Sequence, residues 1–240
     1  MLRLLPRLAL RAAALQAGVT ASIAGSQLSQ CAAEPAHAVH AAVRDIYASL
    51  PDVHAIPEAE EDEIDETGGH EGYGELTPPA VTALLRLVPL SADDAFFDLG
   101  SGAGVVVTQL ALLGFRAVGI ELSPTRHAVA VAALAQVPVP HRCEARREDL
   151  LAVPCDDATV AFIAGLLFDD AFMTRLGRKL ATLPRLRAIA TLSPFPPDAR
   201  DRLAAAGYEE RGGGDLECTW GPAPVYLYVR PAPEAFPLGC

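Results

Sequence analysis

The run Phe96-Phe97-Asp98-Leu99-Gly100-Ser101-Gly102-Ala103-Gly104 is the most informative part of the sequence. A short apolar strand leads into glycines at alternate positions, which allow a tight turn and a close backbone approach to a ligand. The third glycine comes one residue too early for the dinucleotide fingerprint Gly-x-Gly-x-x-Gly. Asp98 lies within the strand, where its carboxylate suits the ammonium group of a ligand and would repel a pyrophosphate. The run therefore favours a ligand with an amino-acid part over a dinucleotide.

Further acids follow at the ends of the next predicted strands. Glu121 closes the run Val118-Gly119-Ile120, twenty-one residues after Gly100. An acid at the end of the second strand is placed to accept hydrogen bonds from both ribose hydroxyls. Asp149 follows the predicted third strand and suits an adenine amino group, although an exposed loop acid explains it nearly as well. These spacings predict a nucleoside site.

The chain around this motif alternates between strands and helices. Predicted helices cover 105–113, 124–136 and 171–183, and predicted strands cover 95–99, 116–120, 141–145, 159–164 and 187–192. Such alternation forms a parallel sheet with right-handed crossovers. After a helix at 198–206, two β-rich runs at 215–220 and 225–229 are joined by Gly221-Pro222-Ala223-Pro224, which indicates a hairpin. We expect an α/β fold with a seven-stranded, doubly wound, mostly parallel sheet and a C-terminal antiparallel hairpin.

Composition excludes several classes of protein. With 240 residues, 51% of them hydrophobic, the chain is long enough for one domain with its own core. Its apolar runs are broken before the roughly 20 residues that a bilayer-spanning helix needs, so no membrane span is expected. The net charge of −11 comes mostly from nine acids between Glu58 and Glu75, a stretch without Lys or Arg that predicts a solvated loop. Strong direct binding of nucleic acid is not expected from this charge balance.

The cysteines and histidines indicate neither a disulfide-linked fold nor a metal site. Five cysteines without a Cys-x-x-Cys pair indicate free thiols in a reducing compartment. His37 and His40 are three residues apart, but no nearby cysteine completes a metal site.

The glycine motif and its following acids resemble those of the class I S-adenosylmethionine-dependent methyltransferases, over about residues 93–229. The resemblance implies that family's fold and S-adenosyl-L-methionine as the cofactor. It also implies a set of cofactor-binding residues: Asp98, Gly100, Ser101, Gly102, Gly104, Glu121 and Asp149. This motif indicates the cofactor but gives almost no information about the substrate.

A second motif resembles a narrower family. Gly72-Tyr73-Gly74-Glu75-Leu76-Thr77-Pro78 is similar to the Tyr-Gly-Glu loop of the disruptor-of-telomeric-silencing family, the non-SET histone-lysine methyltransferases. That loop closes over the methionine end of the cofactor, which implies that Glu75 and Thr77 contact the cofactor. The family's Ser-x-Pro-Phe after strand five is similar to Thr191-Leu192-Ser193-Pro194-Phe195 in layout. The substrate implied is a protein lysine, in a histone or an organellar protein, and the resemblance also implies a role in chromatin regulation.

The chain departs from that family in two places. Ala164, Gly165 or Leu166 replaces the strand-four asparagines of an Asn-Asn-Phe-x-Phe motif, which removes a polar group from the cofactor and lysine channel. The basic segment that grips nucleosomal DNA is missing, since Lys179 is the single lysine of the chain.

Methyl transfer to an amine is an in-line displacement that needs alignment and a neutral nucleophile. We expect Tyr73, Glu75 and Phe168 to act in catalysis. Glu75 or Asp98 would stabilise the developing cation. Phe168, Phe195, Tyr73 and Trp220 are candidates for a hydrophobic sleeve that lowers the lysine pKa. A core position is at least as good an explanation for each of these aromatic residues, and for Trp220 it is the preferred one.

The chain divides into three expected regions. Residues 1–30 carry Arg3, Arg7 and Arg11 among Leu, Ala and Ser, with no acid before Glu34, which is typical of a transit segment. An Ala-rich helix within the fold is the alternative. Residues 31–92 are expected to form a helical N-terminal cap with the acidic loop and the cofactor-closing loop, and residues 93–240 the methyltransferase domain. A transit segment would direct the chain to a mitochondrion or plastid, and without one the nucleus or cytoplasm is expected.

Other functions stay open at this point. The acidic stretch would also suit methylation of a small cationic amine. A nucleotide-binding oxidoreductase is disfavoured by the early third glycine and by Asp98. A non-catalytic cofactor-binding relative is made credible by the missing strand-four asparagines.

Overall fold

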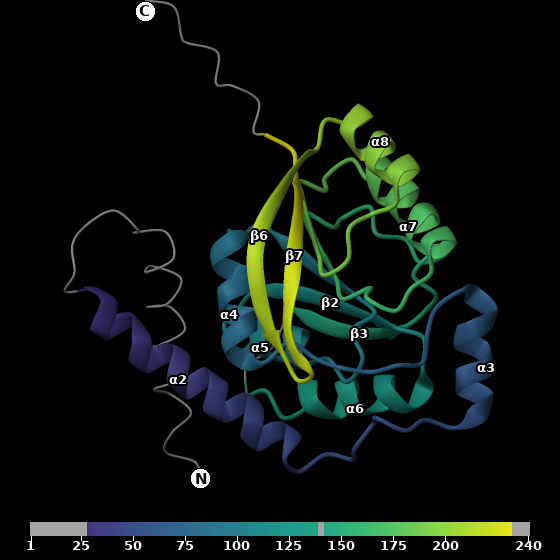
Figure 1. Cartoon of the computed structure of the whole chain (residues 1–240). Coiled ribbons are helices and arrows are strands. Elements are labelled where there is room, and N and C mark those ends of the chain that lie inside the picture. Colours follow the sequence, from purple (N-terminus) through teal and green to yellow (C-terminus); the bar gives the residue numbers. More distant parts are fainter. Residues whose placement is uncertain (1–27, 139–141, 232–240) are drawn as a thin grey trace, which may run out of the picture.

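The computed structural model describes residues 28–138 and 142–231 (Figure 1). Residues 1–27 of the predicted transit segment lie outside the described residues. Among residues 28–138 and 142–231, no helix is long and apolar enough to cross a membrane. In the same residues, no group of His, Cys, Asp and Glu side chains is arranged to hold a metal ion.

The core of the molecule is a seven-stranded sheet with the order β3-β2-β1-β4-β5-β7-β6. Its strands are β1 (Ala95–Leu99), β2 (Arg116–Glu121), β3 (Cys143–Arg147), β4 (Val160–Ile163), β5 (Ala188–Thr191), β6 (Glu209–Cys218) and β7 (Gly221–Val229). Strands β1 to β5 pair in parallel, whereas β7 runs antiparallel to β5 and β6. The predicted fold class is confirmed. The strand order reverses between β1 and β4, and the carboxyl ends of the strands at such a switch point form a crevice.

Helices cover both faces of the sheet (Figure 1). They are α2 (Leu28–Tyr47), α3 (Glu58–Thr67), α4 (Pro78–Leu87), α5 (Val105–Leu112), α6 (Pro124–Leu134), α7 (Asp170–Thr182) and α8 (Pro197–Ala205). Helices α2, α4, α5 and α6 pack on one face, and their apolar residues form a core with the inner residues of the strands. Helices α7 and α8 pack on the other face. Both cores are buried between the sheet and a helical layer, as in other doubly wound folds.

Several helices begin where the local sequence caps them. Thr77 accepts a hydrogen bond from the backbone N–H of Ala80, and Pro78 occupies the first turn of α4. Ser123 caps α6 in the same way, and the Asp169 side chain accepts from the N–H of Phe172 in α7. A side-chain oxygen before the helix satisfies a donor that has no intrahelical partner. These caps fix the helix starts beside the carboxyl ends of the strands.

The acidic stretch differs from its prediction. Residues Glu58–Thr67 form helix α3 rather than a solvated loop. The helix lies at the outer end of the molecule in Figure 1 and contributes one buried apolar side chain, Ile64. Acids in its first turn, Glu58, Glu60 and Glu61, favour the helix because they complement its dipole.

The hairpin turn also differs from its prediction. The two strands meet at Thr219 and Trp220, and the residues predicted as the turn, Gly221–Pro224, belong to β7. Of β7, only Tyr226–Val229 pair with β5. The first half of β7 thus has one free side, where the missing N–H of a proline is tolerated.

The cysteines whose side chains are described, Cys143, Cys155 and Cys218, are buried free thiols.

Candidate active site

A pocket of 450 Å³ lies at the carboxyl ends of β1, β2 and β4, where the strand order reverses. This volume is within the usual range for small-molecule sites. The glycine turn after β1, the loop before α4, helix α3 and the loop after β4 all contribute to its wall.

The glycine turn forms the floor of the pocket. Gly100 and Gly102 have φ values of 84° and 54°, a region that side chains rarely adopt. A Cβ at Gly102 would lie 2.3 Å from Cε2 of Tyr73, so only glycine admits that ring. Gly104 differs from its expected role. It precedes α5, does not line the pocket, and leaves no room for a Cβ because one would lie 2.9 Å from the Cβ of Ala130.

Glu121 is held by the backbone at the end of β2. Its Oε2 accepts a 2.8 Å hydrogen bond from the N–H of Gly102, and its Oε1 accepts one of 2.8 Å from the N–H of Ser123. Burial raises the pKa of this carboxyl, while these backbone donors lower it and limit the rise. Each oxygen keeps a lone pair free for a further donor from a ligand.

Asp98 is a buried acid in β1 with an exposed fraction of 3%. Among the described residues, no side chain forms an ion pair with it. Burial raises its pKa to about 8, and the nearby charges of Glu121 and Glu75 add to the shift. A buried acid that lacks a cation creates a site with affinity for one.

Tyr73 closes the pocket from the side of the loop before α4. Its hydroxyl accepts a 3.1 Å hydrogen bond from the N–H of Ala103 and donates one to Glu75. The guanidinium of Arg126 lies 4.8 Å from the centre of the Tyr73 ring, and the His54 ring meets that ring edge-on at 5.3 Å. Burial raises the pKa of the Glu75 carboxyl, because the charged form loses hydration.

The segment after Tyr73 is anchored to the C-terminal hairpin. The backbone of Glu75 and Thr219 is joined by a 2.9 Å hydrogen bond, and the N–H of Thr77 donates to the carbonyl of Glu217 at 3.0 Å. Leu76 forms an antiparallel bridge with Cys218. Thr77 differs from its expected role, because it does not line the pocket and its hydroxyl caps α4. The hairpin therefore fixes the start of α4 and the position of Glu75.

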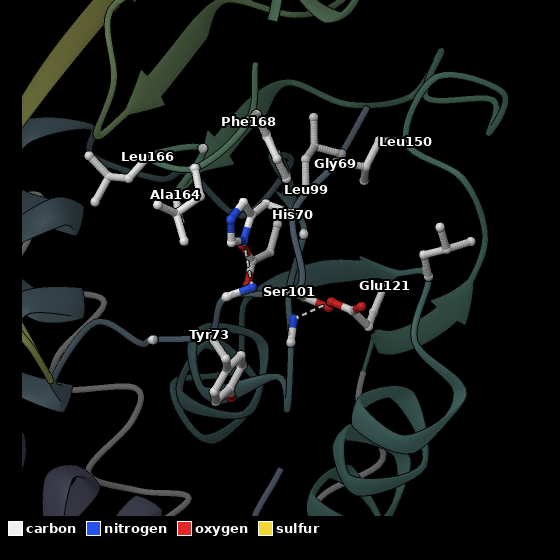
Figure 2. Close-up of a pocket in the computed structure, with 18 of the residues that line it drawn as sticks. Gly69, His70, Tyr73, Leu99, Ser101, Glu121, Leu150, Ala164, Leu166 and Phe168 are labelled. Atoms are coloured by element: carbon white, nitrogen blue, oxygen red, sulfur yellow. Dashed lines mark hydrogen bonds between the residues drawn. The ribbon is translucent and has the colours of Figure 1, made fainter. Parts of the chain in front are cut away.

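The two ends of the pocket differ in character. In Figure 2, Glu121 and Leu150 lie on one side, Ala164 and Leu166 lie on the other, and His70 lies between them in this view. Asp149 and Ile64 of α3 also line the pocket. The Oδ1 of Asp149 accepts a 2.8 Å hydrogen bond from the N–H of Leu151. The second side is apolar, Phe168 lies between the two sides in this view (Figure 2), and Trp220 also lines the pocket.

Solved structures share this fold. A magnesium protoporphyrin IX methyltransferase from Synechocystis PCC 6803, solved with bound S-adenosylmethionine, aligns with a TM-score of 0.53 at 16% identity over 80% of this chain and 90% of that chain. A putative RNA methyltransferase from Pyrococcus horikoshii aligns with a TM-score of 0.53 at 12% identity, over 82% and 98%. Identities this low establish the fold, and the fold is that of class I methyltransferases.

Sequence comparison narrows the assignment. The family described as "Histone methylation protein DOT1" matches residues 53–145, which hold the Tyr73 loop, the glycine turn and Glu121. The chain is a class I, S-adenosylmethionine-dependent methyltransferase similar to DOT1. A histone-lysine N-methyltransferase of Caenorhabditis elegans, H3 lysine-79 specific, is 32% identical over 125 residues, which are 46% of this chain and 13% of that protein. The methyltransferase thus spans about an eighth of that relative's length.

The residues of this methyltransferase fit the cofactor. Within the described part of the chain, the buried Oγ of Ser101 has no hydrogen-bond partner, and it lies in the turn that approaches the pocket. Asp98 lacks a cation, and the Glu121 oxygens have free lone pairs. A ligand with an ammonium group and a ribose would complement Asp98 and Glu121.

The structure separates the predicted aromatic residues of the methyltransferase. Tyr73, Phe168 and Trp220 line the pocket. Phe195 is instead buried in the core, with its ring centre 5.2 Å from that of Tyr228. The preferred core position of Trp220 is wrong, because the hairpin turn leaves 48% of its surface exposed.

Sequence reasoning missed Arg126, Ile64 and His70, which also line the pocket. Arg126 is buried on the apolar face of α6 beside Val129, Ala130 and Ala133. A charged residue at a position of core periodicity is a usable signal, because an arginine is seldom buried without a role. No comparable signal marks Ile64 or His70.

Proposed function

We propose that this methyltransferase transfers a methyl group to the side-chain amine of a protein lysine. The observation that supports this most strongly is that a half-buried acid, Glu75, and apolar walls line the same pocket. Leu99, Phe162, Ala164, Phe168 and Leu192 supply those walls. A lysine presents an aliphatic stem with an amine at its end, which complements such a surface. The similarity to a histone-lysine N-methyltransferase supports the same substrate class.

In this proposal, each end of the pocket has its own task. Asp98 pairs with the ammonium group of the cofactor, and the Glu121 oxygens accept hydrogen bonds from its ribose. Asp149, Leu150 and Ile64 enclose its adenine. S-adenosylmethionine supplies a methyl group carried on a positively charged sulfur. Tyr73 closes over the glycine turn and excludes water from the reacting groups.

The lysine must lose a proton before its nitrogen can attack. The apolar walls around Phe168 disfavour the ammonium form and lower the lysine pKa. Glu75, whose own pKa is raised by burial, is placed to accept that proton. With S-adenosylmethionine bound, the neutral nitrogen would take up the methyl group, and the rest of the cofactor would leave as a neutral thioether. The positive charge of the sulfonium would then reside on the lysine nitrogen.

Labelled methyl transfer tests this function. The full chain is incubated with radiolabelled S-adenosylmethionine and core histones, and with the same histones after every lysine has been blocked by acetylation. We expect label on lysine in the first sample alone. Glu75→Gln should lower the rate about 100-fold, as for other positioned acid–base groups, whereas Asp156→Asn, on an exposed loop, should not.

One observation favours a second function. Ala164 and Gly165 carry no polar side chain at the end of β4. Binding of S-adenosylmethionine without transfer to any amine would contradict the lysine proposal and favour a cofactor-binding protein without turnover.

A further inference from the structure

Exposed apolar side chains gather at the mouth of the pocket. Among the described residues, four large hydrophobic side chains are well exposed, and three of them line the pocket. Leu166 and Leu167, in the loop between β4 and α7, expose 40% and 53% of their surface, and Trp220 in the hairpin turn exposes 48%. The fourth, Val131 in α6, does not line the pocket. We call Leu166, Leu167 and Trp220 the apolar rim.

Contacts within the chain cover only part of the surface of the rim side chains. A Cβ at Gly72 would lie 2.3 Å from Cδ1 of Leu167, and one at Gly74 would lie 2.0 Å from the Trp220 ring. Leu167 and Trp220 therefore pack on the glycines that flank Tyr73. About half of each surface stays open after this packing, and Leu166 lies beside Ala164 at the pocket wall (Figure 2). An apolar cluster continuous with a site is a common mark of a docking surface.

The charges next to the rim are mostly negative. Asp169 and Asp170 follow the β4 loop, Glu71 precedes Gly72, and Glu217 lies in the hairpin near Trp220. Two nearby arginines are engaged within the chain, because Arg175 of α7 donates to the carbonyl of Thr67 and Arg126 of α6 donates to that of Glu71. A partner segment without acids and with basic residues would complement this surface.

We propose that the apolar rim binds an apolar side chain close to the target lysine in a positively charged segment of another protein. This inference rests on the proposed function, because the lysine must enter the same pocket. The rim would hold the flanking side chain while the lysine reaches Glu75. Burial of one leucine-sized side chain corresponds to at least about a ten-fold gain in affinity.

Synthetic peptides with a single lysine in an Arg/Gly/Ser background test the rim. In one set every flanking position is Ser, and in the other sets Leu occupies one position at a time, within three residues of the lysine. We expect the chain to methylate one Leu-bearing set with a KM about ten-fold lower than the Ser set and a similar kcat. Leu166→Ser should bring this KM ratio close to one, and Val131→Ser should preserve it.

Each alternative outcome has a distinct meaning. Transfer to all peptides without a preference for Leu, or a preference that survives in both Leu166→Ser and Leu167→Ser, overturns the docking surface and leaves the proposed function intact. Binding of S-adenosylhomocysteine without transfer to any lysine peptide or histone rejects the proposed function, and the docking surface with it. The ratio is taken within one variant, so a change in folded fraction cannot alter it.

Discussion

Asp98 shows how a single side chain prepares the site for a cation. The strand places it beside Glu121 and Glu75, and burial holds its pKa near 8 instead of in the acidic range. At neutral pH most molecules without ligand carry a proton on this carboxyl. A ligand ammonium favours the charged carboxylate, so ligand binding and proton release are coupled.

We therefore expect binding of S-adenosylhomocysteine to release about one proton at pH 7. Its affinity should fall about ten-fold for each pH unit below the Asp98 pKa of about 8. Titration calorimetry in two buffers with different ionisation enthalpies measures the proton release. Asp98→Asn should remove the release and weaken binding about ten-fold or more, whereas Asp156→Asn should behave as wild type. A pH-independent affinity in the wild-type chain would contradict this account.

Arg126 is the residue on which the Tyr73 loop depends. It donates from Nη2 to the carbonyl of Glu71 and from Nε to that of Val53 at 3.5 Å, and its guanidinium stacks on Tyr73. Arg126→Met keeps the apolar stem and removes these contacts, which together hold the loop over the glycine turn. We expect cofactor affinity to fall about ten-fold and amide exchange at residues 71–75 to speed up. The same change at an exposed arginine, Arg211→Met, is the control. Unchanged exchange in this loop would show that Tyr73 is held by other contacts.

Among the elements, α3 is the part of the acidic stretch that packs beside the pocket. Glu60 accepts hydrogen bonds from the hydroxyl of Ser123 at 2.5 Å and from the N–H and hydroxyl of Thr125 at 3.1 and 2.6 Å. Glu63 pairs with Arg147 at 3.1 Å. These contacts hold α3 against the start of α6, so that Ile64 covers one end of the pocket.

Glu60→Ala should therefore loosen the whole helix. The loss of three hydrogen bonds to a carboxylate predicts faster amide exchange across 58–67 and an affinity for S-adenosylhomocysteine about ten-fold weaker. Asp62→Ala, at an exposed position of the same helix, controls for lost helix charge. Equal exchange rates in the two variants would count against docking through Glu60.

The elements also show what the sequence can predict. The strands and helices around the glycine turn lie within a few residues of their predicted limits, because apolar periodicity and local caps specify them. The acidic stretch was misjudged because its helix gains its docking from Ser123 and Thr125, far along the chain. The hairpin turn was misjudged because Pro222 and Pro224 mark turns in most contexts, and only the short pairing of β5 admits them to a strand.

The candidate site shows the same difference between features that local sequence specifies and features that depend on distant residues. Tyr73, Glu75, Asp98, Gly100, Ser101, Gly102, Glu121, Asp149 and Phe168 line the pocket as their motifs indicated. Thr77 and Gly104 belong to the same motifs but serve α4 and the packing against α6. Motif spacing locates a site, and the direction of each side chain depends on neighbours that are distant in sequence.

For the molecule as a whole, the acids that line the pocket lower the free energy of unfolding of the ligand-free protein as pH rises. Burial raises the pKa values of Asp98, Glu75 and Glu121 above those of the unfolded chain. The folded state therefore binds more protons than the unfolded state between the two pKa values of each group. Stability due to these groups is present at low pH and is lost as pH rises through the folded pKa. A cation in the pocket should reverse this loss, because it favours the carboxylates.

We thus expect the ligand-free chain to lose about 1 kcal/mol of unfolding free energy between pH 7 and pH 8, mostly through Asp98. For a chain of this length the shift in Tm is about 2–4 °C. Saturating S-adenosylhomocysteine should abolish the loss, and so should Asp98→Asn, whose amide does not titrate. Scanning calorimetry of both proteins at the two pH values, with and without the ligand, measures all of these shifts. A wild-type Tm that stays level, or a slope that persists in Asp98→Asn, would mean that Asp98 is not the group that titrates. The comparison therefore isolates the contribution of this one buried acid to the pH dependence of stability.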